Sequence, residues 1–226
     1  MENEFLYNLI TSLARVFKPK SKKKRPEGFY SPHIKLYGIE DVQKAIDNYR
    51  KDNKNPTFLD IGGRNGEFSG FAKGFDYKIL EIDTNVKKIR NVIYGDICNA
   101  KNIKDETIDI CFSNNVFEHI KEPWAAAAEI SRILKPNGLV ITIAPFAWRY
   151  HPVPVDYFRY SHDGLGFLFE RTNKIERVIS GYDLSGRRAN HNGGKLKGGL
   201  DAVPIDELGG WREHWMTIYI GKKLIT

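Results

Sequence analysis

Apolar and polar residues follow two rhythms along this chain, and each rhythm predicts one kind of element. Short apolar runs bounded by turn residues predict strands at 57–61, 78–82, 91–94, 107–113, 138–144, 174–182 and 214–221. Apolar positions three and four apart predict helices at 39–51, 66–73, 116–120, 123–135 and 162–170. Because strands and helices alternate, we expect an α/β fold with a doubly wound, mostly parallel seven-stranded sheet.

The first 26 residues differ from the rest of the chain and are expected to form a separate segment, with a larger domain at 27–226. Apolar residues from Phe5 to Phe17 fall on one face of a predicted helical extension, and the basic run "KPKSKKKRP" follows. This segment carries +5 of the total charge of +7. An apolar helix face followed by a basic segment is typical of sequences that bind an anionic membrane surface. Two alternatives stay open: the helix packs on its own domain or on a second subunit, and the strip is a solvated linker.

Composition excludes several classes of protein. With 41% hydrophobic and 28% charged residues the chain is typical of a soluble globular protein. No apolar run reaches the roughly 18 residues that span a bilayer, and no secretory signal is visible, so we expect a cytoplasmic protein, peripheral at the inner membrane face. Cys98 and Cys111 have no ligand-spaced partners and are expected to be reduced thiols. The stretch 181–210 is rich in glycine and charge and predicts a long loop or insertion.

The stretch "FLDIGGRNGEF" at 58–68 predicts a strand that runs into a glycine turn, a common place for a nucleotide. A dinucleotide fingerprint needs glycine at the first, third and sixth turn positions, and Arg64 and Glu67 break that pattern. The phosphate-binding Gly-Lys-Ser/Thr pattern is absent as well. What remains is a series of carboxylates at the ends of successive strands: Asp60, Asp83 in "LEID" and Asp96 in "GDI". Such carboxylates can accept ribose hydroxyls and an adenine amino group, which specifies an adenosine without a pyrophosphate.

Five motifs in order resemble the class I S-adenosylmethionine-dependent methyltransferases, in particular the type 11-like subgroup that acts on small molecules and sugars. They are "FLDIGGRNG", "LEID", "GDI", "IDICFSNNVFEHIKEP" and "EISRILKPNGLVITIAP", within roughly residues 56–170. The resemblance implies a Rossmann-like methyltransferase fold with S-adenosyl-L-methionine as cofactor. One departure is Arg64, because the family usually has glycine at that position.

The resemblance also assigns residues to parts of the cofactor. The turn wraps the methionine part, Asp83 binds ribose, Asp96 with Ile97 holds adenine, and Asp60 anchors the turn or the cofactor's ammonium group. The cofactor-binding positions implied are Asp60, Gly62, Gly63, Asn65, Gly66, Asp83, Asp96, Ile97 and Asn114.

Two places offer groups for the acceptor. In sugar methyltransferases that this chain resembles, a histidine in the region of His119 is the base; alternatively His119 caps or packs its short helix. The loop "PFAWRYHPVPVDYFRYSHDGL" at 145–165 is stiffened by prolines and rich in aromatic, Arg and His residues, which suits a polar ring such as a sugar, or it is an ordinary lid. The catalytic candidates are His119, His151 and Asp156, and the substrate-binding candidates are Tyr157, Arg159 and Tyr160.

The leading hypothesis is an S-adenosylmethionine-dependent O-methyltransferase that modifies a sugar hydroxyl of a glycan or lipid-linked polysaccharide at the cytoplasmic membrane face. The alternative is a methyltransferase of a small metabolite, lipid or quinone. A nucleic-acid methyltransferase is less favoured because "SNNVFEH" is not the Asn/Asp-Pro-Pro-aromatic turn of base-modifying enzymes. A non-catalytic cofactor-binding protein is a further alternative. No histidine shows metal-ligand spacing with a carboxylate on a helix, so we expect no metal and metal-independent transfer.

Overall fold

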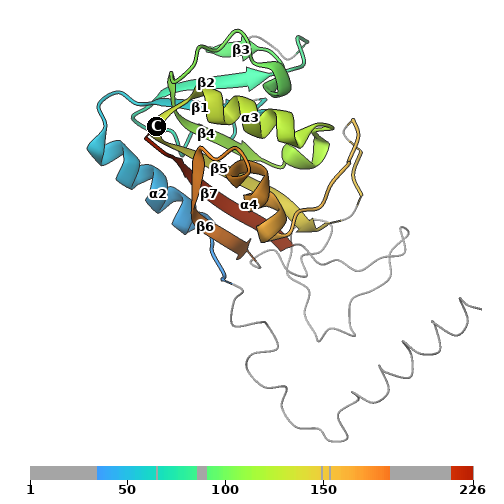
Figure 1. Ribbon diagram of the computed structural model, residues 1–226. Helices are drawn as coiled ribbons and strands as arrows, with labels where there is room; N and C mark the ends of the chain where they lie inside the picture. Colours follow the sequence, from blue (N-terminus) through green and yellow to red (C-terminus); the bar gives the residue numbers. More distant parts are fainter. Residues whose placement is uncertain are drawn as a thin grey trace, which may run out of the picture. The chain divides into compact units, whose positions relative to one another are not determined.

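The computed structural model describes residues 35–64, 66–85, 91–148, 150–152, 154–183 and 215–225. Seven strands of this part of the chain form one sheet (Figure 1), namely β1 (Thr57–Ile61), β2 (Asp76–Glu81), β3 (Val92–Tyr94), β4 (Ile108–Asn114), β5 (Leu134–Ala147), β6 (Ile175–Asp183) and β7 (Trp215–Lys223). The described helices are α2 (Ile39–Asp52), α3 (Pro123–Ile133) and α4 (His162–Glu170), with short 3-10 turns η1 (Ile97–Asn99) and η2 (Phe117–His119).

The strand order is β3-β2-β1-β4-β5-β7-β6. Strands β1 to β5 pair in parallel, and β7 runs antiparallel to both β5 and β6. The prediction of a doubly wound, mostly parallel seven-stranded sheet is therefore confirmed. The chain winds outward from β1 in one direction and from β4 in the other, which places the topological switch point between these two strands. In such sheets ligands bind outside the carboxyl ends of the strands at the switch point.

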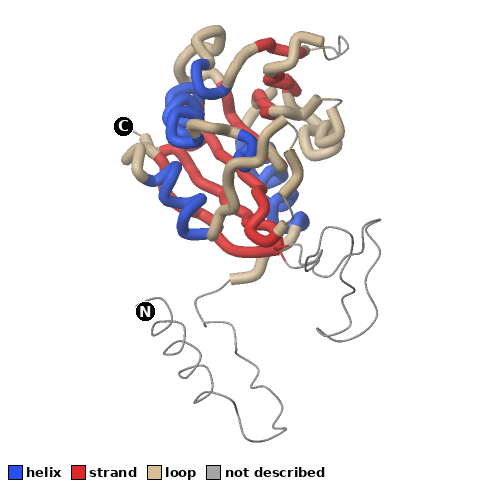
Figure 2. Tube along the Cα trace, turned by 90° about the vertical axis from the view of Figure 1, so that its right-hand side faces the viewer, coloured by secondary structure: helices blue, strands red, loops and turns tan. Residues whose placement is uncertain are grey.

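Apolar side chains cover both faces of the sheet and create two cores. In β4, Ile110 and Phe112 pack on the same face as Val42 and Ile46 of α2, whereas Cys111 faces α3 and α4 on the other side. Strands buried on both faces read as continuous apolar runs, which explains the uninterrupted pattern of β4 and β5. Figure 2 shows the strands from the side, in red, with helices packed beside them.

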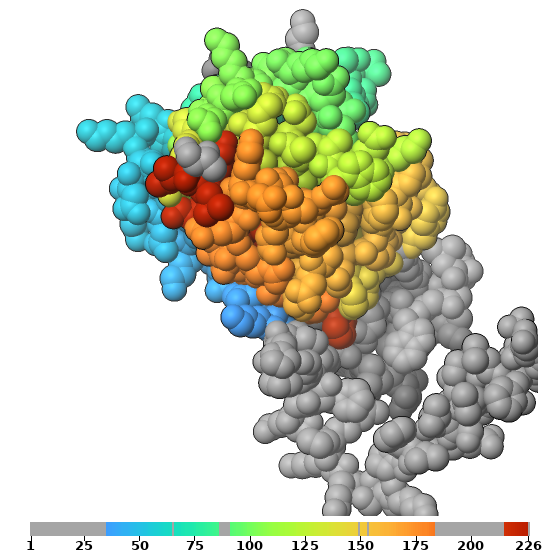
Figure 3. Space-filling view, viewed as in Figure 1, coloured from blue at the N-terminus to red at the C-terminus, as the bar shows by residue number. Residues whose placement is uncertain are grey.

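Helices α3 and α4 cover one face of the sheet together. Ser131 of α3 donates a hydrogen bond of 3.1 Å to Thr172, two residues after the end of α4. The space-filling view shows the atoms of the two helices in close contact over this face (Figure 3). The aromatic rings of Phe169 in α4 and Tyr219 in β7 stack beneath them, with centroids 5.2 Å apart.

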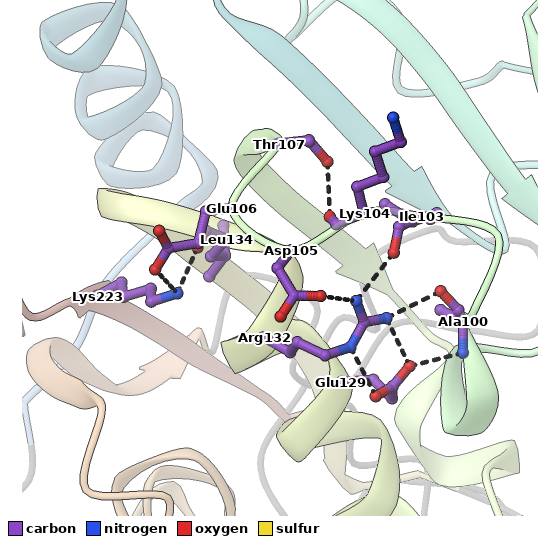
Figure 4. A network of polar contacts seen from close by, with 10 residues as sticks. All are labelled: Ala100, Ile103, Lys104, Asp105, Glu106, Thr107, Glu129, Arg132, Leu134 and Lys223. Atoms are coloured by element: carbon purple, nitrogen blue, oxygen red, sulfur yellow. Dashed lines mark hydrogen bonds and ion pairs between the residues drawn. The ribbon is translucent and has the colours of Figure 1, made fainter.

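A network centred on Arg132 ties α3 to the segment that follows η1 (Figure 4). The guanidinium donates to the carbonyl oxygens of Ala100 and Ile103, both at 2.9 Å, and to Asp105 at 2.6 Å. Glu129, one turn before Arg132, accepts from Arg132 and from the backbone N–H of Ala100 at 2.8 Å. Because both helical residues hold this segment, η1 and its preceding carboxylate have a fixed position at the edge of the sheet.

Three local predictions need correction. Residues 66–74 form a run of turns with hydrogen bonds to the residue three positions back, not a helix, and Gly66, with a φ of +71°, cannot be part of a right-handed helix. Helix α3 ends at Ile133 and β5 begins at Leu134, whereas the helix was expected to continue to 135. Residues 181–183 belong to β6 and not to a loop.

Other predictions lie outside the described residues. These are the amphipathic helix and basic strip at 1–26, the first residues of the 27–226 domain up to 34, and the predicted loop beyond 183. Among the helices that the structure does describe, none is both long and apolar enough to cross a bilayer.

Candidate active site

A cavity of about 460 Å³ opens at the carboxyl ends of β1, β2 and β4. It combines apolar walls with acidic and backbone polar groups, and its lining includes Ile61, Gly62, Leu80, Glu81, Ile82, Gly95, Asp96, Ile97, Cys98, Asn115, Val116, His119, Ile120, Pro154 and Tyr157. Mostly apolar concave sites with a few directed polar groups are typical of small-molecule and cofactor sites.

The glycine turn after β1 forms one wall of this cavity. Gly62 has a φ of +71° and donates its N–H to the Leu80 carbonyl at 2.9 Å, and a Cβ there would lie 2.9 Å from a methyl of Val116. At Gly63 a Cβ would overlap the Asp60 carboxylate. Arg64 adopts a φ of +35°, a region that favours glycine, which explains why the resembled family has glycine there. Asn65 lies outside the described residues.

Asp60 lies directly beneath the turn and is 1% exposed. Its Oδ2 accepts a hydrogen bond of 2.5 Å from the Tyr77 hydroxyl, whereas Oδ1 has no hydrogen-bond partner among the described residues. Burial raises the pKa of Asp60 to about 6, although the Tyr77 hydrogen bond acts in the opposite direction. The carboxylate therefore supports the turn while keeping one oxygen available for a further donor.

The raised pKa gives a stability prediction for Asp60→Asn. The folded-state pKa of about 6 exceeds the reference value of 3.8, so rising pH across this window removes protons from the unfolded chain first and destabilises the fold. The amide avoids this cost, and we expect the free energy of unfolding at pH 7.5 to rise by on the order of 1–3 kcal/mol. Urea titrations at about pH 4.5 and pH 7.5 measure it, with the exposed Asp76→Asn as control. An equal change at both pH values would contradict the assignment.

At the carboxyl end of β2 the acidic residue that lines the cavity is not Asp83, which the sequence motif indicated, but Glu81. Asp83 is exposed, and its Oδ1 accepts from the backbone N–H and the side-chain amide of Asn85 at 2.9 and 3.1 Å. Glu81, two residues earlier, lines the cavity, is 4% exposed, and its Oε2 has no hydrogen-bond partner among the described residues. Its Oε1 accepts from the N–H of Asp83 at 3.0 Å, which fixes the side chain. The structure thus places Glu81, and not Asp83, at the cavity.

The predicted adenine-binding residues do lie at this cavity. Asp96 precedes η1, and its Oδ1 accepts from the N–H of Cys98 at 2.8 Å, which caps the 3-10 turn. Ile97 is buried behind it and contributes an apolar surface. A carboxylate beside an apolar wall can accept from an exocyclic amino group while the wall packs on a ring. The structure therefore places both residues at a cavity, and their contact with adenine stays a prediction.

A second cavity of about 390 Å³ adjoins the first, with Gly62, Arg64, Asn115 and His119 lining both. Its remaining lining residues are Gly63, Glu67, Phe68, Asn114, Trp148 and His151. Asn114, the last residue of β4, was predicted beside the cofactor and lies in this second cavity. His119 stands where the two cavities meet, which is where a group transferred from one bound molecule to another would pass.

His119, His151 and Glu118 form a cluster at this junction. The ring centroids of the two histidines are 5.0 Å apart, and each Nε2 lies near Oε1 of Glu118, at 3.7 Å for His119 and 3.6 Å for His151. Glu118 is fully buried, and neither of its side-chain oxygens has a hydrogen-bond partner among the described residues. Burial raises the pKa of Glu118 to about 7. Sequence reasoning missed Glu118 because nothing local distinguishes it from a solvated helix residue.

A hydrogen bond orients the His119 ring, and a close contact with a carboxylate orients the His151 ring. Nδ1 of His119 lies 2.7 Å from the Val155 carbonyl oxygen, which can only accept, so this nitrogen carries a proton. Nδ1 of His151 lies 3.1 Å from Oδ2 of Asp156. Asp156 is ionised: burial alone would raise its pKa, but Arg159 and the backbone N–H of His151 lower it to about 2. Nδ1 of His151 therefore also carries a proton, and in neutral rings both Nε2 atoms carry the lone pair.

The other acceptor-site predictions have mixed outcomes. The side chain of Asp156 is 1% exposed, lies against His151 and lines neither cavity. Arg159 pairs with Asp156 and donates to the Trp148 carbonyl at 3.0 Å, and the buried Tyr160 donates to the Phe117 carbonyl at 3.0 Å. Neither is among the residues that line the two cavities, and these contacts of both hold the loop, so their role in substrate binding stays a prediction. Tyr157 is exposed at the first cavity.

The expectation that no metal ligands come together rested on helical spacing. In the structure, ligand atoms of Glu118, His119 and His151 all lie within 4.8 Å of one another. His162 is outside this group and pairs with Asp163 at 3.3 Å, and the histidines at 33, 191 and 214 lie outside the described residues. Three potential ligands therefore converge from η2 and from the loop after β5.

Comparison with known proteins identifies the central part of the chain. Residues 59–142 match the family model described as a methyltransferase domain. An uncharacterised methyltransferase of Mycobacterium ulcerans is 36% identical over 95 residues, 38% of this chain and 37% of that protein. Another from Mycobacteroides abscessus is 30% identical over 146 residues, 58% of this chain and 55% of that protein. The match thus spans less than two thirds of the length of these relatives.

Solved structures support the fold. A SAM-dependent methyltransferase from Archaeoglobus fulgidus aligns with a TM-score of 0.56 over 82% of this chain and 95% of that chain, at 17% identity. At this identity the likeness extends to the arrangement of strands and helices. The Rossmann-like architecture predicted from the sequence motifs is therefore confirmed.

Proposed function

Because residues 59–142 form a methyltransferase domain of the S-adenosylmethionine-dependent class, we propose that this protein methylates a sugar hydroxyl of a glycan or lipid-linked polysaccharide. The observation that carries this proposal is the pair of adjoining cavities that meet at His119. One offers acidic and apolar groups suited to an adenosine, and the other offers two histidines and an indole ring suited to a polar acceptor.

The first cavity fits S-adenosyl-L-methionine by the chemistry of its donors and acceptors. One carboxylate oxygen of Glu81 has no hydrogen-bond partner in the described part of the chain and is available to the ribose hydroxyls. Asp96 with Ile97 offers an acceptor and an apolar wall for adenine. The glycine turn brings backbone close to the methionine part, and Oδ1 of Asp60 is an acceptor for its ammonium group. Bound there, the cofactor supplies an activated methyl group on a sulfonium.

The second cavity fits a hydroxyl acceptor. In methyl transfer the acceptor oxygen bonds to the methyl carbon as the carbon–sulfur bond breaks, and the hydroxyl proton must leave. His119 can take this proton at Nε2, because Nδ1 is held protonated by the Val155 carbonyl. The buried Glu118 carboxylate stabilises the imidazolium that forms, and His151, held by Asp156, orients the acceptor.

A sugar is favoured over an apolar acceptor because the second cavity combines ring surface with hydrogen-bonding groups. Trp148 and Tyr157 are partly exposed at the two cavities, and Asn114 offers an amide beside them. A flat aromatic face packs against the C–H face of a sugar ring, while polar groups bind its hydroxyls. A small metabolite, lipid or quinone remains the alternative acceptor, because the cofactor half of the site would be the same.

The test is transfer of labelled methyl from S-adenosylmethionine into an extract of the source cell. The extract is fractionated into lipid-linked glycan, free metabolites, nucleic acid and protein. We expect label in the glycan fraction. Label in metabolites or lipids would favour the alternative, and label in none of them with intact cofactor binding would favour a binding protein.

We further propose that residues 1–26 hold the enzyme at an anionic membrane surface, where a lipid-linked acceptor is anchored. The argument is the coincidence of an apolar helix face and a charge of +5 in this segment. Deleting residues 1–26 is expected to abolish sedimentation with anionic vesicles, because each cation near such a surface contributes about 1 kcal/mol. Neutral vesicles are the control. Unchanged sedimentation of the shortened protein would contradict the proposal.

A further inference from the structure

Glu118, His119 and His151 each bring one possible ligand atom into a cluster in which these atoms lie within 4.8 Å of one another. The two Nδ1 atoms carry protons because each faces an oxygen that can only accept. In neutral rings, two lone pairs at Nε2 then face one carboxylate oxygen of Glu118. Glu118 is fully buried, and neither of its carboxylate oxygens has a hydrogen-bond partner among the described residues, so both oxygens are available to a metal ion.

Distances indicate what fits between these atoms. The separations of 3.6 and 3.7 Å between Nε2 and Oε1 exceed the range of N–H···O hydrogen bonds, about 2.7–3.2 Å. Around a tetrahedral zinc ion with bonds of about 2.0–2.2 Å, neighbouring ligand atoms lie about 3.3–3.6 Å apart. The observed spacing therefore matches two ligands of one metal ion more closely than a shared proton.

The surroundings have the second layer that metal-bound histidines show. Such histidines donate their other ring N–H to a backbone carbonyl or a carboxylate, which fixes the ring and its tautomer. His119 does so to Val155, and Nδ1 of His151 lies 3.1 Å from Oδ2 of Asp156, which is itself paired with Arg159. The third possible ligand is the carboxylate of Glu118, a fully buried residue in the middle of η2.

We propose that Glu118, His119 and His151 bind one divalent first-row metal ion, with zinc as the best match to two imidazoles and a carboxylate. Both histidines line the second cavity, so the remaining coordination position opens toward the acceptor. Three protein ligands with one open position are the arrangement of catalytic zinc sites. A use of this ion in catalysis rests on the proposed function. In the metal-bound form Nε2 of His119 is a ligand and not the base, and the proton of an acceptor hydroxyl bound at the open position would pass to water instead.

Metal binding is tested on the full-length protein after treatment with a chelator. We expect uptake of about one equivalent of Zn²⁺ by calorimetry, and visible absorption bands of four-coordinate Co²⁺ when Co²⁺ replaces it. Glu118→Gln and His151→Gln are each expected to weaken Zn²⁺ binding by about tenfold or more, because each loses one ligand. His162→Gln is the matched control, since His162 lies outside the cluster.

No Zn²⁺ uptake by the wild-type protein, or equal weakening in His162→Gln, would overturn the metal site. S-adenosylmethionine affinity is measured in the same samples and separates the two proposals. Cofactor binding without Zn²⁺ binding removes only the metal site and leaves the histidines as bases. Zn²⁺ binding without methyl transfer to any fraction leaves the site standing and removes the proposed reaction. Activity that is lost on chelation and restored by Zn²⁺ would support the catalytic use.

Discussion

His119→Ala is expected to lower the turnover number by about 10²-fold or more while the affinity for S-adenosylmethionine changes little. His119 stands at the junction of the two cavities and offers Nε2 to the acceptor, whereas the cofactor groups proposed above lie on β1, β2 and η1. The turnover number is measured as labelled methyl incorporated into the acceptor fraction at saturating cofactor. Cofactor affinity is measured separately by calorimetry, so that loss of binding and loss of chemistry are distinguished.

His162→Ala is the control for this experiment, because His162 lies at the start of α4 and lines neither cavity. Full turnover in His119→Ala would remove this residue from the mechanism. A parallel loss of cofactor affinity and turnover would show instead that His119 supports the cofactor cavity, which it also lines.

Glu81→Gln is expected to weaken S-adenosylmethionine binding by about 10–100-fold, whereas Asp83→Asn is expected to leave it nearly unchanged. A hydrogen bond to a charged group contributes about 1.5–3 kcal/mol, and each 1.4 kcal/mol is about tenfold in affinity. Glu81 lines the cavity with an unpartnered oxygen, and Asp83 uses its carboxylate to hold Asn85. The two substitutions are matched, because each replaces a carboxylate by the corresponding amide and the two residues are only two positions apart in the chain.

Calorimetric titration of both variants with S-adenosylmethionine and S-adenosylhomocysteine measures the effect. The demethylated product has the same ribose, so a role for Glu81 at the ribose requires equal weakening for both ligands. If only Asp83→Asn weakened cofactor binding, the ribose contact would belong to Asp83, as the sequence motif indicated.

The comparison of Glu81 with Asp83 shows why the motif was ambiguous. In a half-buried strand, alternation of polar and apolar residues would tell which acid faces the ligand. In β2 the consecutive residues Ile79, Leu80 and Glu81 are all buried, because a parallel sheet is covered on both faces. The motif "LEID" therefore placed a carboxylate at the strand end without saying which one turned inward.

The residues at 145–165 show a second limit of local patterns. The pattern correctly indicated a loop rich in functional groups next to the site, and His151 does line the second cavity. Arg159 and Tyr160, however, bond to the Trp148 and Phe117 carbonyls and hold the loop in place. The same types of residue support a loop or contact a ligand, so the sequence does not distinguish the two roles. Only the direction in which the side chain points in the folded protein does.

The sequence by itself determined the alternation of strands and helices, the glycine turn, the carboxylates at the strand ends and the methyltransferase motifs. All of these depend on neighbouring residues, through side-chain periodicity and backbone conformation. Only the tertiary structure decided that Glu81 faces the cavity and that Glu118 and His119 meet His151. Those residues come together because β4 and β5 pair side by side, so that the segments following them return to the same edge of the sheet. Such proximity depends on strand pairing and loop direction, which no local pattern records.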